Sequence, residues 1–90
     1  RMLTRLSTKT LGEVLIVEIG ATNVGSITQT FRSDDAIEKG DEKGYFRFGG
    51  SATMTLFEPG RVKLSDDLLH YSAQSIELYA KMGDVMGQAL

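Results

Sequence analysis

Cysteine is absent from this sequence, and histidine occurs only once. Without cysteine the chain can form no disulfide framework and no thiolate zinc site, and it has no cysteine nucleophile. A single histidine cannot build a histidine-rich metal site, so we expect no metal. The lack of cysteine does not identify a redox compartment.

An excess of one charge and long apolar runs are also missing. Ten Lys and Arg stand against twelve Asp and Glu, a formal net charge of -2. No basic excess is therefore available to hold nucleic acid or an anionic membrane by charge alone. The longest clean apolar run, Val14-Leu15-Ile16-Val17, is far shorter than the roughly 20 residues that a membrane helix needs. No signal peptide is recognisable.

The composition that remains is typical of one small globular domain. The chain has 90 residues, of which 41% are hydrophobic and 24% charged, and this balance argues against disorder. Ten glycines do not fit a long coiled coil. Because the sequence begins at Arg1 and is patterned from there, we expect residues 1–90 to be part of a longer protein.

Glycines divide the chain into short segments with β character. The first, residues 12–20, has a continuous apolar centre that predicts a strand buried on both faces. Four further segments are rich in β-branched or aromatic residues, or alternate apolar with polar positions. These are residues 24–31, 45–48, 51–57 and 61–64.

The polar segments between them predict turns and a short helix. We expect turns at residues 39–42 and at Pro59-Gly60. Ser65, followed by two aspartates, is typical of an N-cap that opens a helix. Residues 75–82 fit a strand and a short helix about equally well. The sum is a mostly β fold, a small barrel-sandwich-like domain with short helical turns near the C-terminus.

Gly49-Gly50-Ser51 is the first candidate for chemistry. Two glycines inside a strand-like pattern usually mark a bulge or a close approach of backbone. A serine after such an unhindered peptide could attack the carbonyl of its own preceding residue and turn the amide into an ester. Elimination then leaves dehydroalanine, and hydrolysis leaves a pyruvoyl group. The plainer interpretation is a β-bulge with a solvent-facing serine.

Other titratable residues have plainer structural interpretations. His70 has no evident catalytic partner and is expected at the surface or at a helix cap. The acidic pairs lack the spacing of a calcium loop, so we expect solvated turns and caps, and the same holds for the charged run 38–43. These pairs are Asp34-Asp35, Asp41-Glu42 and Asp66-Asp67.

Two further patterns suggest binding functions. Lys81 beside Met82 is similar to the modified lysine of biotin- and lipoyl-carrier domains, although Gly83 follows at once. Arg47 lies among three aromatic residues, which could stack on single-stranded nucleic acid. The net charge opposes that function, and alternating aromatics favour a core. We therefore expect no nucleic-acid partner. The aromatic residues are Tyr45, Phe46 and Phe48.

Several short motifs follow one another in a specific order. They are E-I-G-A-T-N-V-G-S-I from Glu18, K-G-D-E-K-G-Y-F from Lys39, F-G-G-S from Phe48, L-F-E from Leu56 and K-M-G from Lys81. In this order and spacing the chain, over roughly residues 10–87, resembles the C-terminal part of phosphatidylserine decarboxylase proenzymes. The ordered set, with Gly-Gly-Ser in its proper place, is specific.

The resemblance implies a pyruvoyl-dependent lyase that makes its own cofactor from a zymogen. Autocatalytic cleavage between Gly50 and Ser51 would leave residues 1–50 as the end of the β chain and residues 51–90 as the α chain. Ser51 would become the pyruvoyl group, with Phe48 and Gly49 as the supporting motif. The pyruvoyl carbonyl would condense with the headgroup amine of phosphatidylserine and accept the electron pair left by CO₂.

The product implied by this chemistry is phosphatidylethanolamine, a phospholipid. Such enzymes work at a membrane surface, so the resemblance implies peripheral association, on the cytoplasmic face in a bacterium. The family's longer N-terminal region anchors to the membrane and supplies an Asp and a His that activate the serine. No position in this chain matches that pair.

Departures from the family pattern keep other functions open. Ala52 stands where Thr or Ser is usual, and Thr55 lies in a normally apolar stretch. Tyr71 and Ser75 replace a common Asn and a common Gly. One alternative is a soluble pyruvoyl amino-acid decarboxylase of the same superfamily, and another is a non-enzymatic β-barrel binding or carrier module. Arg47 is our candidate for a phosphate contact.

The isolated chain is expected to be unprocessed. Because the activating pair is missing, we expect an intact Gly50–Ser51 bond and no decarboxylase activity in a soluble fragment. Its partner would be the missing N-terminal part of the same protein. Uncovered apolar surface and unpaired strand edges would favour homo-oligomers.

Overall fold

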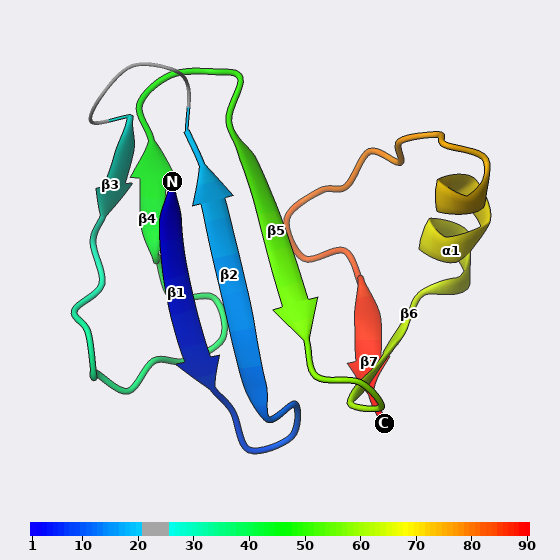
Figure 1. Ribbon diagram of the computed structural model, residues 1–90, viewed down its shortest axis with the longest axis horizontal. Helices are drawn as coiled ribbons and strands as arrows, with labels where there is room; N and C mark the ends of the chain where they lie inside the picture. Colours follow the sequence, from blue (N-terminus) through cyan, green and yellow to red (C-terminus); the bar gives the residue numbers. More distant parts are fainter. Residues whose placement is uncertain (21–25) are drawn as a thin grey trace. The chain divides into compact units, whose positions relative to one another are not determined.

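The computed structural model describes residues 1–20 and 26–90. Strands predominate within these residues, and the predicted mostly β fold is confirmed (Figure 1). No helix among the described residues is long and apolar enough to cross a membrane. The elements are β1 (Met2–Ser7), β2 (Glu13–Ile19), β3 (Ile27–Gln29), β4 (Gly44–Phe46), β5 (Ala52–Phe57), β6 (Val62–Leu64), α1 (Asp66–Ala73) and β7 (Gly87–Ala89).

The chain divides into two compact units. The first contains residues 1–5 and 15–56, and the second contains residues 6–14 and 57–90. The Gly49-Gly50-Ser51 segment therefore belongs to the first unit, whereas His70 and Lys81 belong to the second.

A three-stranded sheet in the order β1-β2-β5 is the frame of the first unit (Figure 1). The central strand β2 is the strand predicted over residues 12–20. Its burial follows its apolar centre, because Leu15 to Val17 are half-buried and Glu18 is buried. The strand β1 was not among the predicted segments, because residues 2–7, Met-Leu-Thr-Arg-Leu-Ser, neither alternate apolar with polar positions nor have glycine boundaries.

The strands β3 and β4 form a two-stranded sheet, the second sheet of the first unit. The two strands pair antiparallel, with Ile27 opposite Phe46. Gly44 permits this pairing, because a Cβ atom there would lie 2.3 Å from the backbone oxygen of Thr28. The strand β3 falls inside the predicted segment 24–31, of which residues 24 and 25 lie outside the described residues, as does 21–25 of the first motif.

The predicted strand over residues 45–48 is wrong at its C-terminal end. The strand β4 stops at Phe46, and the amide of Arg47 donates to the carbonyl of Ser26 at 2.8 Å. Phe48 lies beyond the strand and is 51% exposed, so it does not share a core face with the half-buried Phe46. Two consecutive glycines, which disfavour regular pairing, follow directly.

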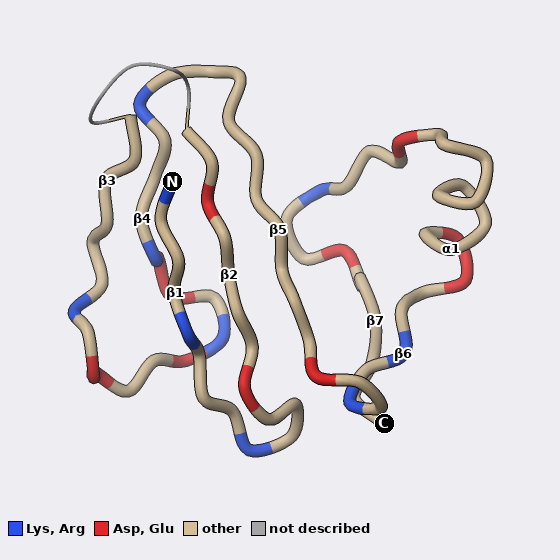
Figure 2. Tube along the Cα trace, in the orientation of Figure 1, with Lys and Arg blue, Asp and Glu red and all other residues tan. Residues whose placement is uncertain are grey.

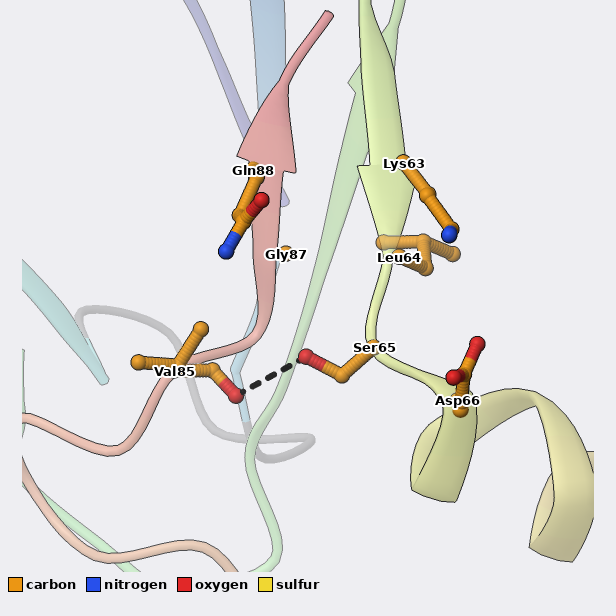
Figure 3. Close-up of a pocket in the computed structure, with 7 residues that line it drawn as sticks. All are labelled: Lys63, Leu64, Ser65, Asp66, Val85, Gly87 and Gln88. Atoms are coloured by element: carbon orange, nitrogen blue, oxygen red, sulfur yellow. Dashed lines mark hydrogen bonds between the residues drawn. The ribbon is translucent and has the colours of Figure 1, made fainter.

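The second unit contains β6, β7 and α1. The strands β6 and β7 pair antiparallel, with Val62 opposite Ala89. The helix begins after Ser65, as predicted, but the Ser65 hydroxyl donates to the carbonyl of Val85 at 3.2 Å and makes no cap hydrogen bond (Figure 3). Residues 76–81, which fitted both strand and helix, form neither.

Both predicted turns are confirmed. At Pro59-Gly60 the amide of Arg61 donates to the carbonyl of Glu58 at 3.3 Å, and Gly60 has a φ of 77°. At residues 38–41 the amide of Asp41 donates to the carbonyl of Glu38 at 3.1 Å. Both turns place glycine where φ is positive, the conformation that glycine adopts without steric cost.

Few apolar side chains are buried. Val14, at 3% exposure, is the one buried hydrophobic residue among those described. The residues of β5 from Ala52 to Leu56 are exposed on both faces of the strand, including Met54 and Leu56 at 51% and 52%. This edge strand carries no charged side chain along its length (Figure 2). Apolar and polar residues therefore alternate along β5, as predicted, but the apolar face of the strand is not buried.

Candidate functional site

Ser51 closes a turn between β4 and β5. Its hydroxyl donates a hydrogen bond to the carbonyl oxygen of Phe48 at 3.2 Å, so the side chain folds back across the two glycines. Ser51 is half-buried, and β5 begins at the next residue. The structure thus brings Phe48, Gly49, Gly50 and Ser51 together in one short turn rather than in a continuous strand.

The two glycines of this turn differ in conformation. Gly50 has a φ of 81°, in the left-handed region, whereas Gly49 is not among the residues with positive φ. A Cβ atom added at either position would meet no atom of the described residues within 4 Å. The predicted close approach of backbone is therefore wrong among the described residues. Backbone conformation, with positive φ at Gly50 alone, distinguishes the two glycines, whereas the space around them does not.

The Ser51 hydroxyl has an orienting acceptor but no base. A backbone carbonyl holds a hydroxyl in place, yet it is too weakly basic to remove the proton for nucleophilic attack. Among the described residues no carboxylate or imidazole is hydrogen-bonded to Ser51. The turn therefore positions the hydroxyl, and its activation requires a group that is not in contact with it here.

A buried ionic cluster in the first unit was not predicted. Glu18 of β2 is only 7% exposed, and its Oε1 accepts hydrogen bonds from Lys43 Nζ at 2.5 Å and from Gln29 Nε2 at 2.8 Å. Lys43 Nζ also donates to Gln29 Oε1 at 2.7 Å and lies 5.0 Å from the ring centroid of Phe31. The cluster joins β2 to the β3–β4 hairpin, whose second strand leads into the Ser51 turn.

Opposing effects set the protonation of Glu18. Burial raises the pKa of its carboxyl, but the hydrogen bonds from Lys43 and Gln29 and the positive charge of Lys43 outweigh burial, so the pKa is lowered. Glu18 is therefore ionised at neutral pH. The expectation that residues 38–43 form only a solvated turn is wrong for Lys43, which is half-buried at the end of that run.

The residues of the three acidic pairs are exposed, as predicted, and three of them accept hydrogen bonds. Asp41 Oδ2 accepts from the amide of Glu38 at 2.8 Å, Glu42 accepts from the Thr30 hydroxyl at 2.7 Å, and Asp67 Oδ1 accepts from the amide of Leu68 at 2.7 Å. No group of three or more histidine or carboxylate residues in the described part of the chain could hold a metal ion.

His70 is a surface residue of α1, as predicted. Its Nε2 lies 3.0 Å from Nε2 of Gln74, and its ring meets the edge of Tyr71 with centroids 5.1 Å apart. Neither neighbour is a carboxylate that would orient an imidazole as a base. Nothing in the second unit therefore gives His70 a catalytic setting.

Lys81 lies at an exposed turn that partly fits the carrier alternative. Its amide donates to Asp84 Oδ2 at 2.8 Å, and its carbonyl accepts from the amide of Asp84 at 3.0 Å. Met82 at the tip is fully exposed. The residues on both sides are irregular rather than paired strands, so the turn is not the tight hairpin that a carrier lysine needs.

A small cavity of about 220 Å³ lies in the second unit (Figure 3). It is lined by backbone and side chains around the β6–β7 ladder and the start of α1, including Lys63, Asp66 and Gln88. The Ser65 hydroxyl beside it is bonded to the carbonyl of Val85 at 3.2 Å. Ser51, Arg47 and His70 do not line this cavity, so it has no part in the predicted chemistry.

Comparison with known proteins identifies a family. The family model described as phosphatidylserine decarboxylase matches residues 1–88. A phosphatidylserine decarboxylase proenzyme of Chlamydia felis is 47% identical over 90 residues, which are 100% of this chain and 30% of that protein. A protein of the same name from Clostridium botulinum is 50% identical over 76 residues, 84% of this chain and 26% of that protein.

The chain spans about 30% of the length of the curated relatives that it matches over its full extent. No solved structure matches it.

Proposed function

The chain belongs to the phosphatidylserine decarboxylase family, and we propose that the protein containing it removes CO₂ from phosphatidylserine with a pyruvoyl group made from Ser51. The observation that carries the proposal is the Phe48–Ser51 turn. In it a serine hydroxyl is held at 3.2 Å from a backbone carbonyl, directly after a left-handed glycine.

The turn fits the residue from which a pyruvoyl group would arise. Ser51 is half-buried in the first unit, and residues 1–20 and 26–90 place no atom within 4 Å of a Cβ added at Gly49 or Gly50. A group formed at position 51 would thus stay anchored at the start of β5 while substrate approaches from the open side. When formed, a pyruvoyl carbonyl supplies an electron sink for the pair released with CO₂.

Self-cleavage would use this chain's own atoms. The Ser51 oxygen attacks the Gly50 carbonyl carbon, the new C–O bond replaces the C–N bond, and the hydroxyl proton ends on the freed amine. Removal of the Ser51 α-proton then breaks the Cβ–O bond and releases Gly50 as a carboxylate. Hydrolysis of the remaining dehydroalanine consumes one water and releases one ammonia. Gly50 would thus end the β chain (1–50) and the α chain (51–90) would begin with the pyruvoyl group.

Activation would come from outside the described contacts of Ser51. No base is bonded to the hydroxyl among the described residues, and general-base help is what makes a serine nucleophilic. We propose that the base belongs to parts of the longer protein that its relatives contain and this chain does not. The isolated 90-residue chain is then unprocessed and inactive. Decarboxylation by purified 1–90 would contradict this.

A lipid substrate places the reaction at a membrane surface. We propose peripheral membrane association of the whole protein, on the cytoplasmic face in a bacterium. Arg47 is the proposed phosphate contact, because it is exposed and lies four residues before Ser51, with its amide fixed to Ser26.

The decisive assay compares substrates and variants in the full-length protein. We expect CO₂ release from phosphatidylserine vesicles and none from free serine, and we expect Ser51→Ala to abolish both cleavage and activity. Thr53→Ala, which removes an exposed hydroxyl from β5, is the matched control and should be processed normally. Activity on free amino acids alone would favour the soluble decarboxylase. An unchanged Ser51→Ala enzyme would exclude the proposed chemistry.

A further inference from the structure

We propose that the left-handed backbone at Gly50 is what prepares the Gly50–Ser51 bond for self-cleavage, and that Gly49 supplies no comparable requirement. This inference rests on the proposed function, since it concerns the rate of the same cleavage. It assigns different roles to two adjacent glycines that the sequence presents as one motif.

Gly49 and Gly50 differ in backbone conformation but not in the space around them. Gly50 has a φ of 81°, whereas Gly49 is not among the residues with positive φ. Within the part of the chain that the structure describes, a Cβ atom at either position would have no neighbour within 4 Å. Crowding by other residues therefore predicts equal tolerance of alanine at 49 and 50, and backbone handedness predicts a difference.

The turn also positions the nucleophile. The Ser51 hydroxyl reaches the carbonyl oxygen of Phe48, three residues back, at 3.2 Å. A turn of this kind is closed by the left-handed residue within it. An L-residue at position 50 would instead favour negative φ and open the turn. The hydroxyl would then lose its acceptor and rotate freely, which removes the alignment that an intramolecular attack needs.

The size of the expected effect follows from conformational preference. An L-alanine populates the left-handed region about tenfold less than the alternatives, and the rate of a step that needs this conformation falls in proportion. Asparagine is larger than alanine but enters the left-handed region more readily, because its side chain bonds the local backbone. If backbone handedness controls cleavage, the cleavage rate should fall from Gly to Asn to Ala at position 50. If the bulk of the side chain beside the reacting carbonyl controls it, the rate should fall from Gly to Ala to Asn.

The experiment follows cleavage of the full-length protein after synthesis, by denaturing gel and intact mass at timed intervals. The variants are Gly49→Ala, Gly50→Ala and Gly50→Asn, with the thermal midpoint of each unprocessed chain as a check on folding. We expect Gly49→Ala to cleave within about twofold of wild type and Gly50→Ala to cleave about tenfold more slowly. Gly50→Asn should lie between wild type and Gly50→Ala.

Several results would overturn the inference. Equal slowing by Gly49→Ala and Gly50→Ala would show that handedness is not selective, and slower cleavage of Gly50→Asn than of Gly50→Ala would show that bulk decides. A normal rate in Gly50→Ala would remove the requirement altogether. Failure of the proposed function looks different, because then the wild-type protein itself would not be cut between Gly50 and Ser51.

Discussion

The ion pair of Glu18 and Lys43 gives the sharpest prediction for stability. The change Lys43→Met keeps an unbranched side chain over the Phe31 ring but leaves the Glu18 carboxylate without its cation. Breaking one side of a buried pair costs about 3–5 kcal/mol. Because the Lys43 side chain is 25% exposed and Glu18 only 9%, water screens part of this loss, and we expect about 2–3 kcal/mol.

The loss of stability in Lys43→Met should depend on pH, in a direction set by the pKa of Glu18. The folded pKa of Glu18 is lowered from its usual 4.5, so its contribution to stability is present above that value and is lost as pH falls through the folded pKa. Without Lys43, burial dominates and the folded pKa rises. The Lys43→Met chain should then lose less stability on acidification than wild type, and the gap between them should narrow below pH 4.5.

Urea unfolding of the 90-residue chain, followed by circular dichroism, measures both effects. A loss of this size is a large fraction of the stability of a small domain, so sucrose is added to all samples to raise stability. The double variant Glu18→Gln, Lys43→Met is the control, since it leaves no uncompensated charge and should cost about 1 kcal/mol. A Lys43→Met loss below about 0.5 kcal/mol, independent of pH, would refute the reasoning.

Two further predictions concern other parts of the chain. Gly12 and Gly60 both have positive φ, but only a Cβ at Gly12 would meet Glu58, at 2.0 Å from Oε2. In urea unfolding, Gly12→Ala should therefore lower the free energy of unfolding by about 0.5–1 kcal/mol more than Gly60→Ala. Equal losses in the two variants would show that the contact with Glu58 does not matter. The exposed apolar strand β5 should make the 90-residue chain associate at micromolar concentration, and Met54→Lys should weaken that association in sedimentation. A strictly monomeric wild-type chain would contradict this.

The strands with strong β patterns could be predicted from sequence, and those without them could not. Glycine boundaries and an apolar centre located β2, and β-branched residues located β3. The strands β1 and β7 have weak intrinsic preference, so their pairing depends on neighbours distant in sequence. The 75–82 segment has apolar residues at helix and strand spacing, but its side chains find no core, and residues 76–81 are irregular.

The sequence named candidate site residues but did not show their local geometry. The order of motifs marked Gly50 and Ser51 as candidates, and that assignment stays a prediction, while the strand pattern around them suggested a bulge or a close backbone approach. The structure instead has a turn in which Gly50 has a positive φ. Lys43 belongs by sequence to a run of solvated charges. The pairing of β3 with β4 sets it beside Gln29, and both side chains bond Glu18 of β2. No local pattern contains that information.

Intact mass of the full-length protein under denaturing conditions tests the central claim most directly. We expect two chains divided between Gly50 and Ser51, with the second lacking its amino group because Ser51 has become a pyruvoyl group. Reduction with borohydride in the presence of an amine should add that amine to the second chain alone. A single uncut chain, or a second chain that begins with an unmodified serine, would contradict the account.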